Sequence, residues 1–164
     1  MWKENNRLHF RSCIDDLIAT ASVQKMSSIS QHVNVNCLEH SIFVSYISFL
    51  ICRFFGLDFV AGARGALLHD LFLYNQHDKS SHDGGHWHTH PRAALVNAQE
   101  ICSLSAKEKD IIAKHMWPVT FFKFPRYGES VVVNLADKLC ASVEGLRLFR
   151  LFGIRKNLIS ALYV

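Results

Sequence analysis

A histidine and an aspartate stand next to each other inside an apolar stretch of this chain, Leu67-Leu68-His69-Asp70-Leu71. Helical spacing of the apolar residues in this region indicates that the doublet lies in a buried helical segment. An imidazole and a carboxylate buried without partners would be strongly destabilising. The doublet therefore predicts a buried site in which other side chains of the chain are partners of His69 and Asp70.

Further residues that could bind metal or transfer protons are spread along the chain. Ten histidines in 164 residues are an informative excess, because histidine is the commonest metal ligand and a usual acid or base. Each expected helix supplies one or two residues of ligand type on its inward face. In chain order these residues are His40, His69, Asp70, His90, His115 and Asp137.

Four of these residues form a coherent set for a single metal ion, namely His40, His69, Asp70 and Asp137. The set combines two imidazoles with two carboxylates. Such mixed nitrogen and oxygen ligands suit iron, manganese, zinc or nickel rather than calcium. The pattern therefore predicts a divalent transition metal, without distinguishing among the four.

The order of the six residues resembles that of the HD-domain metal-dependent phosphohydrolases, with an isolated histidine, a His-Asp doublet, later histidines and a final aspartate. The resemblance covers about Leu38 to Glu144. A bare His-Asp doublet is a weak signal, whereas five separate segments in the right order are a strong one. The segments are Glu39-His40-Ser41, Gly65-Ala66-Leu67-Leu68-His69-Asp70, His90-Pro91-Arg92-Ala93-Ala94, Ile111-Ile112-Ala113-Lys114-His115 and Leu135-Ala136-Asp137-Lys138-Leu139.

The resemblance implies a second metal ion held by His90 and His115, with Asp70 bridging the two ions. Two ions about 3.5–4 Å apart can clamp the attacking and leaving oxygens of a phosphoryl transfer. We therefore expect a phosphohydrolase or phosphodiesterase in which a metal-bound hydroxide attacks a nucleotide-like phosphate ester or anhydride. His69 and Asp70 would stand at its catalytic centre. The resemblance implies no particular substrate.

Three alternatives to this dinuclear hydrolase stay open. In a mononuclear nucleotidase, His90 and His115 would serve substrate binding or proton transfer instead of a second ion. A di-iron oxygenase is a further possibility that the resemblance implies. A non-catalytic regulator would keep the metal as a structural staple and use a basic C-terminal helix to bind a partner or nucleic acid.

Residues near the ligands are candidates for binding substrate. Arg92 follows the expected start of a helix, where backbone N–H groups favour an anion. Lys138 could reach a phosphate, although a solvated lysine is equally consistent with its position. His86 and His88 belong to the run His86-Trp87-His88-Thr89-His90, in which His88 is the alternative to His90 as ligand, and one loop histidine could protonate a leaving oxygen. Residues 121–127, aromatic and basic, are expected to cover the site.

An all-α fold is expected to position these residues, as one compact domain of six to seven helices over residues 1–164. The ligand-bearing core would span about 35–146, between an N-terminal helix in 1–26 and a C-terminal helix in 147–164. Gly62, Gly65 and Ala66 share a face with His69 and would let another helix approach closely. The expected helices are Leu8–Met26, Val35–Phe55, a segment capped by Asp58 and running to about Leu73, a segment capped by His90 and running to about Cys102, a segment capped by Ser105 and running through His115, Glu129–Leu146 and Arg147–Val164.

Composition places the chain among soluble, reduced proteins. With 49% hydrophobic residues, 164 residues suffice for one core. The five cysteines form no CxxC pair or framework, and no secretory signal is visible, so we expect reduced thiols and a cytoplasmic location. The apolar window from Ile42 to Val60 is interrupted by Arg53 and Asp58, which disfavours a membrane span.

The net charge of +4 is unevenly distributed along the chain. Residues 1–117 hold 11 basic and 11 acidic side chains, whereas residues 118–164 hold 7 and 3, so the whole excess lies in the last third. This excess suits a small phosphate or nucleotide substrate, and a solvated helix face explains it equally well. The pattern does not favour nucleic acid as a partner and says nothing about oligomeric state.

Overall fold

Helices dominate the computed structural model of this chain, which describes residues 3–32, 35–74, 86–146, 154 and 156–157. Within these residues lie seven α-helices, one 3-10 turn and two short strands, so the expected all-α fold is confirmed. In chain order they are α1 (Glu4–Ile18), α2 (Ala21–Lys25), η1 (Met26–Ser28), β1 (Ser30–His32), β2 (Val35–Asn36), α3 (Cys37–Phe54), α4 (Phe59–Leu68), α5 (His86–Ile101), α6 (Ala106–Lys114) and α7 (Gly128–Gly145).

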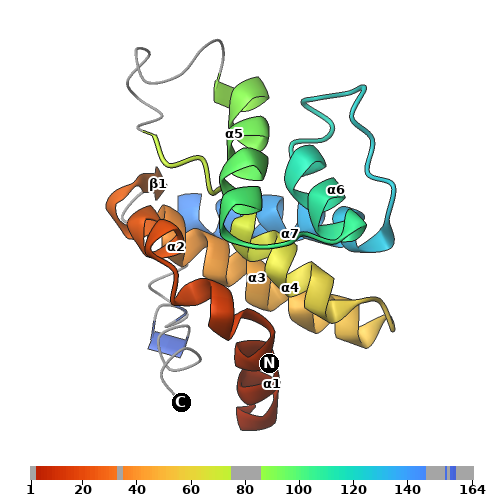
Figure 1. Cartoon of the computed structure of the whole chain (residues 1–164). Coiled ribbons are helices and arrows are strands. Elements are labelled where there is room, and N and C mark those ends of the chain that lie inside the picture. Colours follow the sequence, from red (N-terminus) through yellow and green to blue (C-terminus); the bar gives the residue numbers. More distant parts are fainter. Residues whose placement is uncertain (1–2, 33–34, 75–85, 147–153, 155, 158–164) are drawn as a thin grey trace.

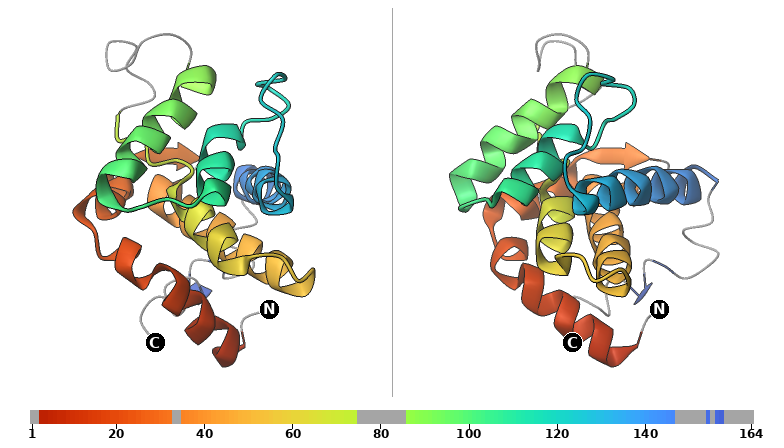
Figure 2. Two further views of the ribbon diagram at one scale, coloured as in Figure 1. Left: turned by 45° about the vertical axis from the view of Figure 1, so that its right-hand side comes forward. Right: turned by 90° about the vertical axis from the view of Figure 1, so that its right-hand side faces the viewer.

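The central pair of the bundle is α3 and α4, which pack along each other (Figure 1). Helix α7 packs against α3, and α6 fits between α4 and α7. Helix α5 lies on α6, whereas α1 packs against α4 (Figure 2). In Figures 1 and 2, α5 and α6 lie on one side of the central pair and α1 on the other. Four helices, α4 to α7, thus meet near one end of α3.

The starts of the central helices are fixed by side-chain caps. Asn36 and Glu39 form a capping box at α3, with the Asn36 side chain accepting from the Glu39 N–H at 2.9 Å. Asp58 caps α4, and Ser105 with Glu108 forms a second capping box at α6. Each cap satisfies backbone N–H groups that have no partner inside the helix. The caps expected at Asp58 and Ser105 are therefore confirmed.

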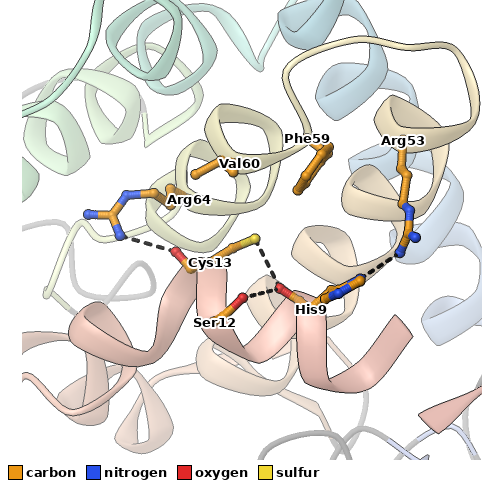
Figure 3. Close-up of a pocket in the computed structure, with 7 residues that line it drawn as sticks. All are labelled: His9, Ser12, Cys13, Arg53, Phe59, Val60 and Arg64. Atoms are coloured by element: carbon orange, nitrogen blue, oxygen red, sulfur yellow. Dashed lines mark hydrogen bonds between the residues drawn. The ribbon is translucent and has the colours of Figure 1, made fainter. Parts of the chain in front are cut away.

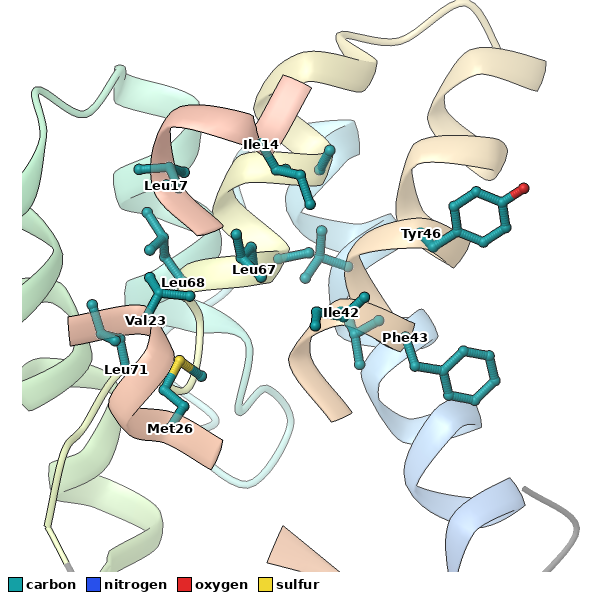
Figure 4. Close-up of a cluster of buried hydrophobic side chains, with 14 of the residues drawn as sticks. Ile14, Leu17, Val23, Met26, Ile42, Phe43, Tyr46, Leu67, Leu68 and Leu71 are labelled. Carbon is teal, nitrogen blue, oxygen red and sulfur yellow. The ribbon is translucent and has the colours of Figure 1, made fainter. Parts of the chain in front are cut away.

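A core of buried aliphatic and aromatic side chains joins the N-terminal segment to the central helices (Figure 4). Phe10 on α1 meets Tyr46 on α3 edge to face, with ring centroids 5.0 Å apart. Leu67, Leu68 and Leu71, the apolar neighbours of the His-Asp doublet, are all fully buried in this core. The backbone on both sides of the doublet is thereby held in place.

Glycines allow the central helices to approach one another closely, as expected from the small residues of α4. A Cβ on Gly62 would lie 2.8 Å from Cys52 Sγ on α3. A Cβ on Gly65 would lie 2.8 Å from the Cδ1 atom of Ile111 on α6. The second contact sets the distance between the two helices that end at His69 and His115.

The N-terminal region is not the single helix expected over Leu8–Met26. Thr20 takes an extended conformation, and its side-chain oxygen accepts the N–H of Val23, so a second helix begins there. The segment between the first two expected helices, residues 27–34, also contains a strand, since β1 pairs with β2 in antiparallel fashion, with Ser30 opposite Asn36. One threonine cap and a strand pair of a few residues involve too few positions to be detected from the spacing of apolar residues.

Helix α4 ends earlier than its apolar periodicity predicts. It stops at Leu68 rather than near Leu73, with His69 as its C-cap and Asp70 in the following turn. The N–H of Phe72 bonds to the carbonyl of Asp70 at 2.8 Å, which turns the chain sharply. The doublet therefore lies at a helix end, and the expectation that it lies inside a helix is wrong.

Helix α5 begins earlier than expected. The proline at 91 lies inside the helix, which starts at His86, so the expectation that His90 caps it is wrong. Pro91 has no N–H to donate to the carbonyl of residue 87, so α5 has one backbone hydrogen bond fewer at this point. Helices α3, α6 and α7 agree with their expected ranges within one or two residues. Residues 75–85, where the sequence suggests a loop, and most of the expected C-terminal helix in 147–164 lie outside the described residues.

Helix α3 and the five cysteines are the features relevant to membrane insertion and to disulfide bonds. Helix α3 is long and apolar enough to cross a bilayer, yet most of it is buried inside the bundle, as in the core helix of a soluble protein. All five cysteines are free thiols, and all but Cys102 are buried. Four of the five expected core cysteines are therefore buried in the bundle.

Candidate metal centre

Residues of metal-ligand type from five helices and one turn converge in the bundle. His69 and His115 occupy the C-cap positions of α4 and α6. Burial is nearly complete, and only Asp137 retains appreciable side-chain exposure, at 15%. The six residues are those expected from the sequence: His40 on α3, His69 and Asp70 after α4, His90 on α5, His115 after α6 and Asp137 on α7.

One group of donor atoms, which we call site A, consists of His40, His69 and Asp137. Asp137 Oδ1 lies 3.1 Å from His40 Nε2 and 3.7 Å from His69 Nε2. One donor atom from each residue lies within 4.8 Å of the other two. Site A therefore could hold a metal ion.

A second group, site B, surrounds the carboxylate of Asp70. Its Oδ1 atom lies 3.4 Å from His90 Nε2 and 3.6 Å from His115 Nε2. Its Oδ2 atom lies 3.3 Å from Nε2 of His69, the residue that also belongs to site A. His69, Asp70 and His115 again form a group within 4.8 Å. The two oxygens of Asp70 thus face different histidines.

The helix ends determine which nitrogen of each ring points into the cluster. His69 Nδ1 donates to the carbonyl of Ala66 at 2.7 Å, and His115 Nδ1 donates to that of Ile112 at 2.9 Å. Carbonyls in the last turn of a helix lack intrahelical donors, so they are available to these rings. Because a carbonyl only accepts, Nδ1 of each ring carries a proton, and Nε2 is the nitrogen that faces the cluster.

Two functional side chains were not predicted from the sequence. Glu144 is fully buried and places Oε2 2.9 Å from His40 Nδ1. It follows Asp137 by seven residues, two helical turns, so the shared helix face could have revealed it. Gln31 on β1 donates from Nε2 to Asp70 Oδ2 at 2.7 Å. Nothing in the sequence pattern indicated Gln31, because the strand that positions it is only three residues long.

Carboxylates control the charge of site A. Burial opposes protonation of His40, but hydrogen bonds to Asp137 and Glu144 outweigh it and raise the pKa of His40 to about 9. Burial likewise disfavours the charged form of Asp137, yet the hydrogen bond from His40 and the nearby positive charges of His69 and His40 hold its pKa below the usual range. Site A thus pairs an ionised carboxylate with a proton that a cation could replace.

Site B contains a histidine that stays neutral. Burial, together with the positive charges of His69 and His90, lowers the pKa of His115 to about 3. His115 Nε2 lies 2.7 Å from His90 Nε2, and since His115 carries its proton on Nδ1, His90 donates this bond. Burial opposes ionisation of Asp70, but the charge of His69 outweighs it and holds the Asp70 pKa well below its usual range.

The donor set fits a transition metal. Ligands about 2.0–2.1 Å from an ion lie roughly 3 Å from one another, which is close to the observed separations. His69 Nε2 is buried and has no hydrogen-bond partner among the described residues, a costly state that an ion would relieve. The chemistry of imidazole and carboxylate matches iron, manganese, zinc or nickel. Buried His and Asp groups here could therefore hold metal, as expected.

The residues expected to bind substrate do not belong to site A or site B. Lys138 donates to the carbonyls of His115 and Asn134 at 3.1 and 3.3 Å, and burial lowers its pKa. Arg92 and His88 are exposed on α5, outside the buried cluster. His86 lies at the start of α5, but its side chain lies outside the described part of the chain. His90, rather than the alternative His88, belongs to the cluster, since it is only 4% exposed.

The aromatic connector between α6 and α7 is open to solvent rather than packed as a cover. Phe121 is 70% exposed, Phe122 is 98% exposed and Phe124 is 61% exposed. Phe124 touches Trp117, with ring centroids 5.3 Å apart. The exposure of three phenyl rings does not fit the expected packed cover over the site.

A separate pocket lies between α1, α3 and α4 (Figure 3). Arg64 contributes to its wall, but its guanidinium is neutralised by Asp16 at 2.6 Å and Glu108 at 3.0 Å. Arg53 reaches His9 from the opposite wall at 3.1 Å. None of the six ligand-type residues lines this pocket, which is therefore distinct from the metal centre.

Comparison of the chain with known protein families, with curated proteins and with solved structures finds no match. The interpretation of the site therefore depends on its own geometry and chemistry.

Proposed function

We propose that the chain is a metal-dependent phosphohydrolase of the HD type, with a dinuclear centre formed by sites A and B. One observation supports the proposal above the others. Asp70 turns one oxygen toward His90 and His115 and the other toward His69. A carboxylate in this position is suited to bridge two ions, which the resemblance to HD-domain enzymes implies.

The six residues would bind the metal ions, and their burial would keep bulk water away from the ions. Histidine Nε2 atoms and the carboxylates of Asp70 and Asp137 would hold the ions, with His69 positioned to serve either site. Bound ions of this kind lower the pKa of coordinated water enough to supply a nucleophile near neutral pH. Burial of the ligands keeps competing water away and strengthens their electrostatic interactions. No separate nucleophilic side chain is required.

The proposed substrate is a phosphate ester or anhydride of a nucleotide-like small molecule. Phosphoryl oxygens are hard anionic ligands that would be attracted by two cations in one centre. The basic excess of +4 also favours an anion. We propose a cytoplasmic location, in keeping with five free thiols.

Hydrolysis by metal-loaded protein tests the proposal. Purified full-length chain, loaded separately with iron, manganese, zinc or nickel, is assayed on bis-p-nitrophenyl phosphate and on a panel of nucleotides. We expect turnover that a chelator abolishes and that His69→Ala lowers by at least 100-fold. His9→Ala, at an exposed position of α1, is the matched control and keeps turnover. Tight metal binding without turnover on any phosphate ester would contradict the enzyme and favour a metal-stapled regulator.

A mononuclear nucleotidase is the second candidate, and one contact favours it. His90 Nε2 and His115 Nε2 already hydrogen-bond to each other at 2.7 Å, an arrangement suited to proton transfer without an ion. In that case site A alone would hold metal. A stoichiometry of one ion per chain in fully active protein would select this candidate over the dinuclear one.

A further inference from the structure

We propose that Glu144 is a positioning residue that makes site A the tighter of the two sites and the first to fill. The inference rests on the proposed metal centre and adds an order of loading to it. It concerns the ring of His40, which is held from both sides by carboxylates of α7.

The contact between Glu144 and His40 joins distant parts of the chain. Glu144 is fully buried, and its Oε2 atom lies 2.9 Å from His40 Nδ1, although the residues are 104 positions apart. Asp137, two turns earlier on the same helix, contacts the other ring nitrogen, Nε2, at 3.1 Å. Helix α7 thus fixes both the position of the His40 ring and the nitrogen that faces site A.

The acceptor on His40 differs from those on the neighbouring histidines. His69 and His115 donate from Nδ1 to backbone carbonyls, which are neutral. A carboxylate acceptor forms a stronger, charge-assisted hydrogen bond and increases the basicity of the opposite ring nitrogen. Site A therefore contains a more strongly donating imidazole than His115 supplies to site B.

The charges around the two sites favour the same order. Site A combines the carboxylate of Asp137 with the nearby charge of Glu144, so a cation there meets two acidic groups. Site B has one carboxylate, Asp70, for two histidines. The first cation should therefore enter site A, and a second must then bind beside an existing positive charge.

Titration of the protein with zinc alone tests this order. Binding is measured by calorimetry in the presence of a competing chelator. In wild-type protein we expect two steps of different affinity. Glu144→Gln keeps an oxygen that can accept from His40 but removes the charge, and should weaken the tighter step by about 10- to 100-fold while leaving the weaker step in place. Glu144→Leu, which removes the acceptor, should weaken it further.

Glu129→Gln is the matched control. Glu129 is also buried on α7, but it accepts from Lys107 and from the backbone N–H of Asp58, away from the cluster. This variant should keep both zinc affinities even if it unfolds more easily. A merely structural role for Glu144 would give the two variants the same metal affinities.

The possible results distinguish failure of the Glu144 proposal from failure of the proposed metal centre. Absence of zinc binding by wild-type protein would overturn both. Two bound ions with an unchanged tighter step in Glu144→Gln would overturn the role of Glu144 and leave the dinuclear centre in place. Should that variant fail to fold, nitrogen NMR of wild-type protein decides: the first equivalent of zinc should shift His40 Nε2, and a first shift at His90 and His115 would contradict the inference.

Discussion

Asp70 lies where the two halves of the centre meet. Its Oδ1 atom faces His90 and His115, while its Oδ2 atom faces His69 and accepts from Gln31 at 2.7 Å. A residue that contributes to both sites should matter more for metal content than a residue that contributes to one.

Removal of the Asp70 carboxylate should therefore deplete the protein of metal most severely. We expect Asp70→Ala to lose more bound metal than His90→Ala or His115→Ala, because Asp70 also contacts His69, a residue of site A. Elemental analysis of the purified variants measures this, with Asp15→Ala on exposed α1 as control. Retention of two ions in Asp70→Ala would contradict the dinuclear centre.

His40 gives the metal-free protein a defined pH dependence. Its pKa is raised from 6.5 to about 9 in the folded state, so the stabilisation that it provides is complete below pH 6.5 and is lost as the pH rises through 9. The loss could reach about 3 kcal/mol, at 1.36 kcal/mol for each pKa unit. Denaturant unfolding of chelated protein at pH 6.5 and 9.5 should show a smaller decrease in His40→Gln than in wild type. Equal decreases would contradict the ion pairs at His40.

At the scale of single residues, the sequence indicated the six histidines and aspartates that make up sites A and B. Histidine and aspartate are recognisable there because they are rare among apolar neighbours at helical spacing. Glu144 and Gln31 were missed for a different reason. Gln31 becomes recognisable only once its contact with Asp70 is known, whereas the spacing of Glu144 from Asp137 on one helix face could have indicated Glu144.

The ends of two helices, rather than their interiors, position the histidines. His69 and His115 are C-caps, and each ring is fixed by a carbonyl three residues earlier. The sequence predicted a longer α4 because its apolar periodicity continues to Leu73. Periodicity detects burial, and residues after a tight turn can be buried as well as residues of a helix.

Close packing of α4 on α6 should set the separation of these two helix ends. A Cβ on Gly65 would approach Cβ and Cγ2 of Ile111 to 3.1 and 3.0 Å, contacts that rotation of the distal methyl cannot relieve. We expect Gly65→Ala to lower the free energy of unfolding by about 1–3 kcal/mol. Denaturant titration measures the change.

The matched control for this substitution is Gly145→Ala, at the end of α7, where an added Cβ meets nothing within 4 Å. That variant should be neutral or slightly stabilising. If Gly65→Ala proves as stable as Gly145→Ala, the close approach of α4 and α6 does not limit the packing of the bundle.

At the scale of the whole molecule, the all-α bundle followed from periodicity, whereas the strand pair and the split N-terminal helix did not. Short elements bury too few residues to leave a pattern. The packing of α5, α6 and α7 around one end of the central pair also depends on contacts distant in sequence. This packing creates the centre, because the centre draws ligands from every one of those helices.

Metal should stabilise the whole fold, since its ligands come from distant parts of the chain. Binding to the folded state alone adds about 2.7 kcal/mol at a ligand concentration of 100 Kd. We expect thermal unfolding to shift upward by several degrees on addition of zinc or manganese, and a chelator to reverse the shift. His69→Ala should show little shift, and a shift in that variant as large as in wild type would place the metal elsewhere.

Metal stoichiometry tests the central claim most directly. Elemental analysis of full-length protein, loaded with a single transition metal and freed of excess ions, gives the number of ions per chain. The dinuclear centre requires about two ions per chain in wild-type protein and fewer in Asp70→Ala than in His90→Ala or His115→Ala. A chain that binds no transition metal, or that binds the same amount when Asp70 is removed, would contradict it.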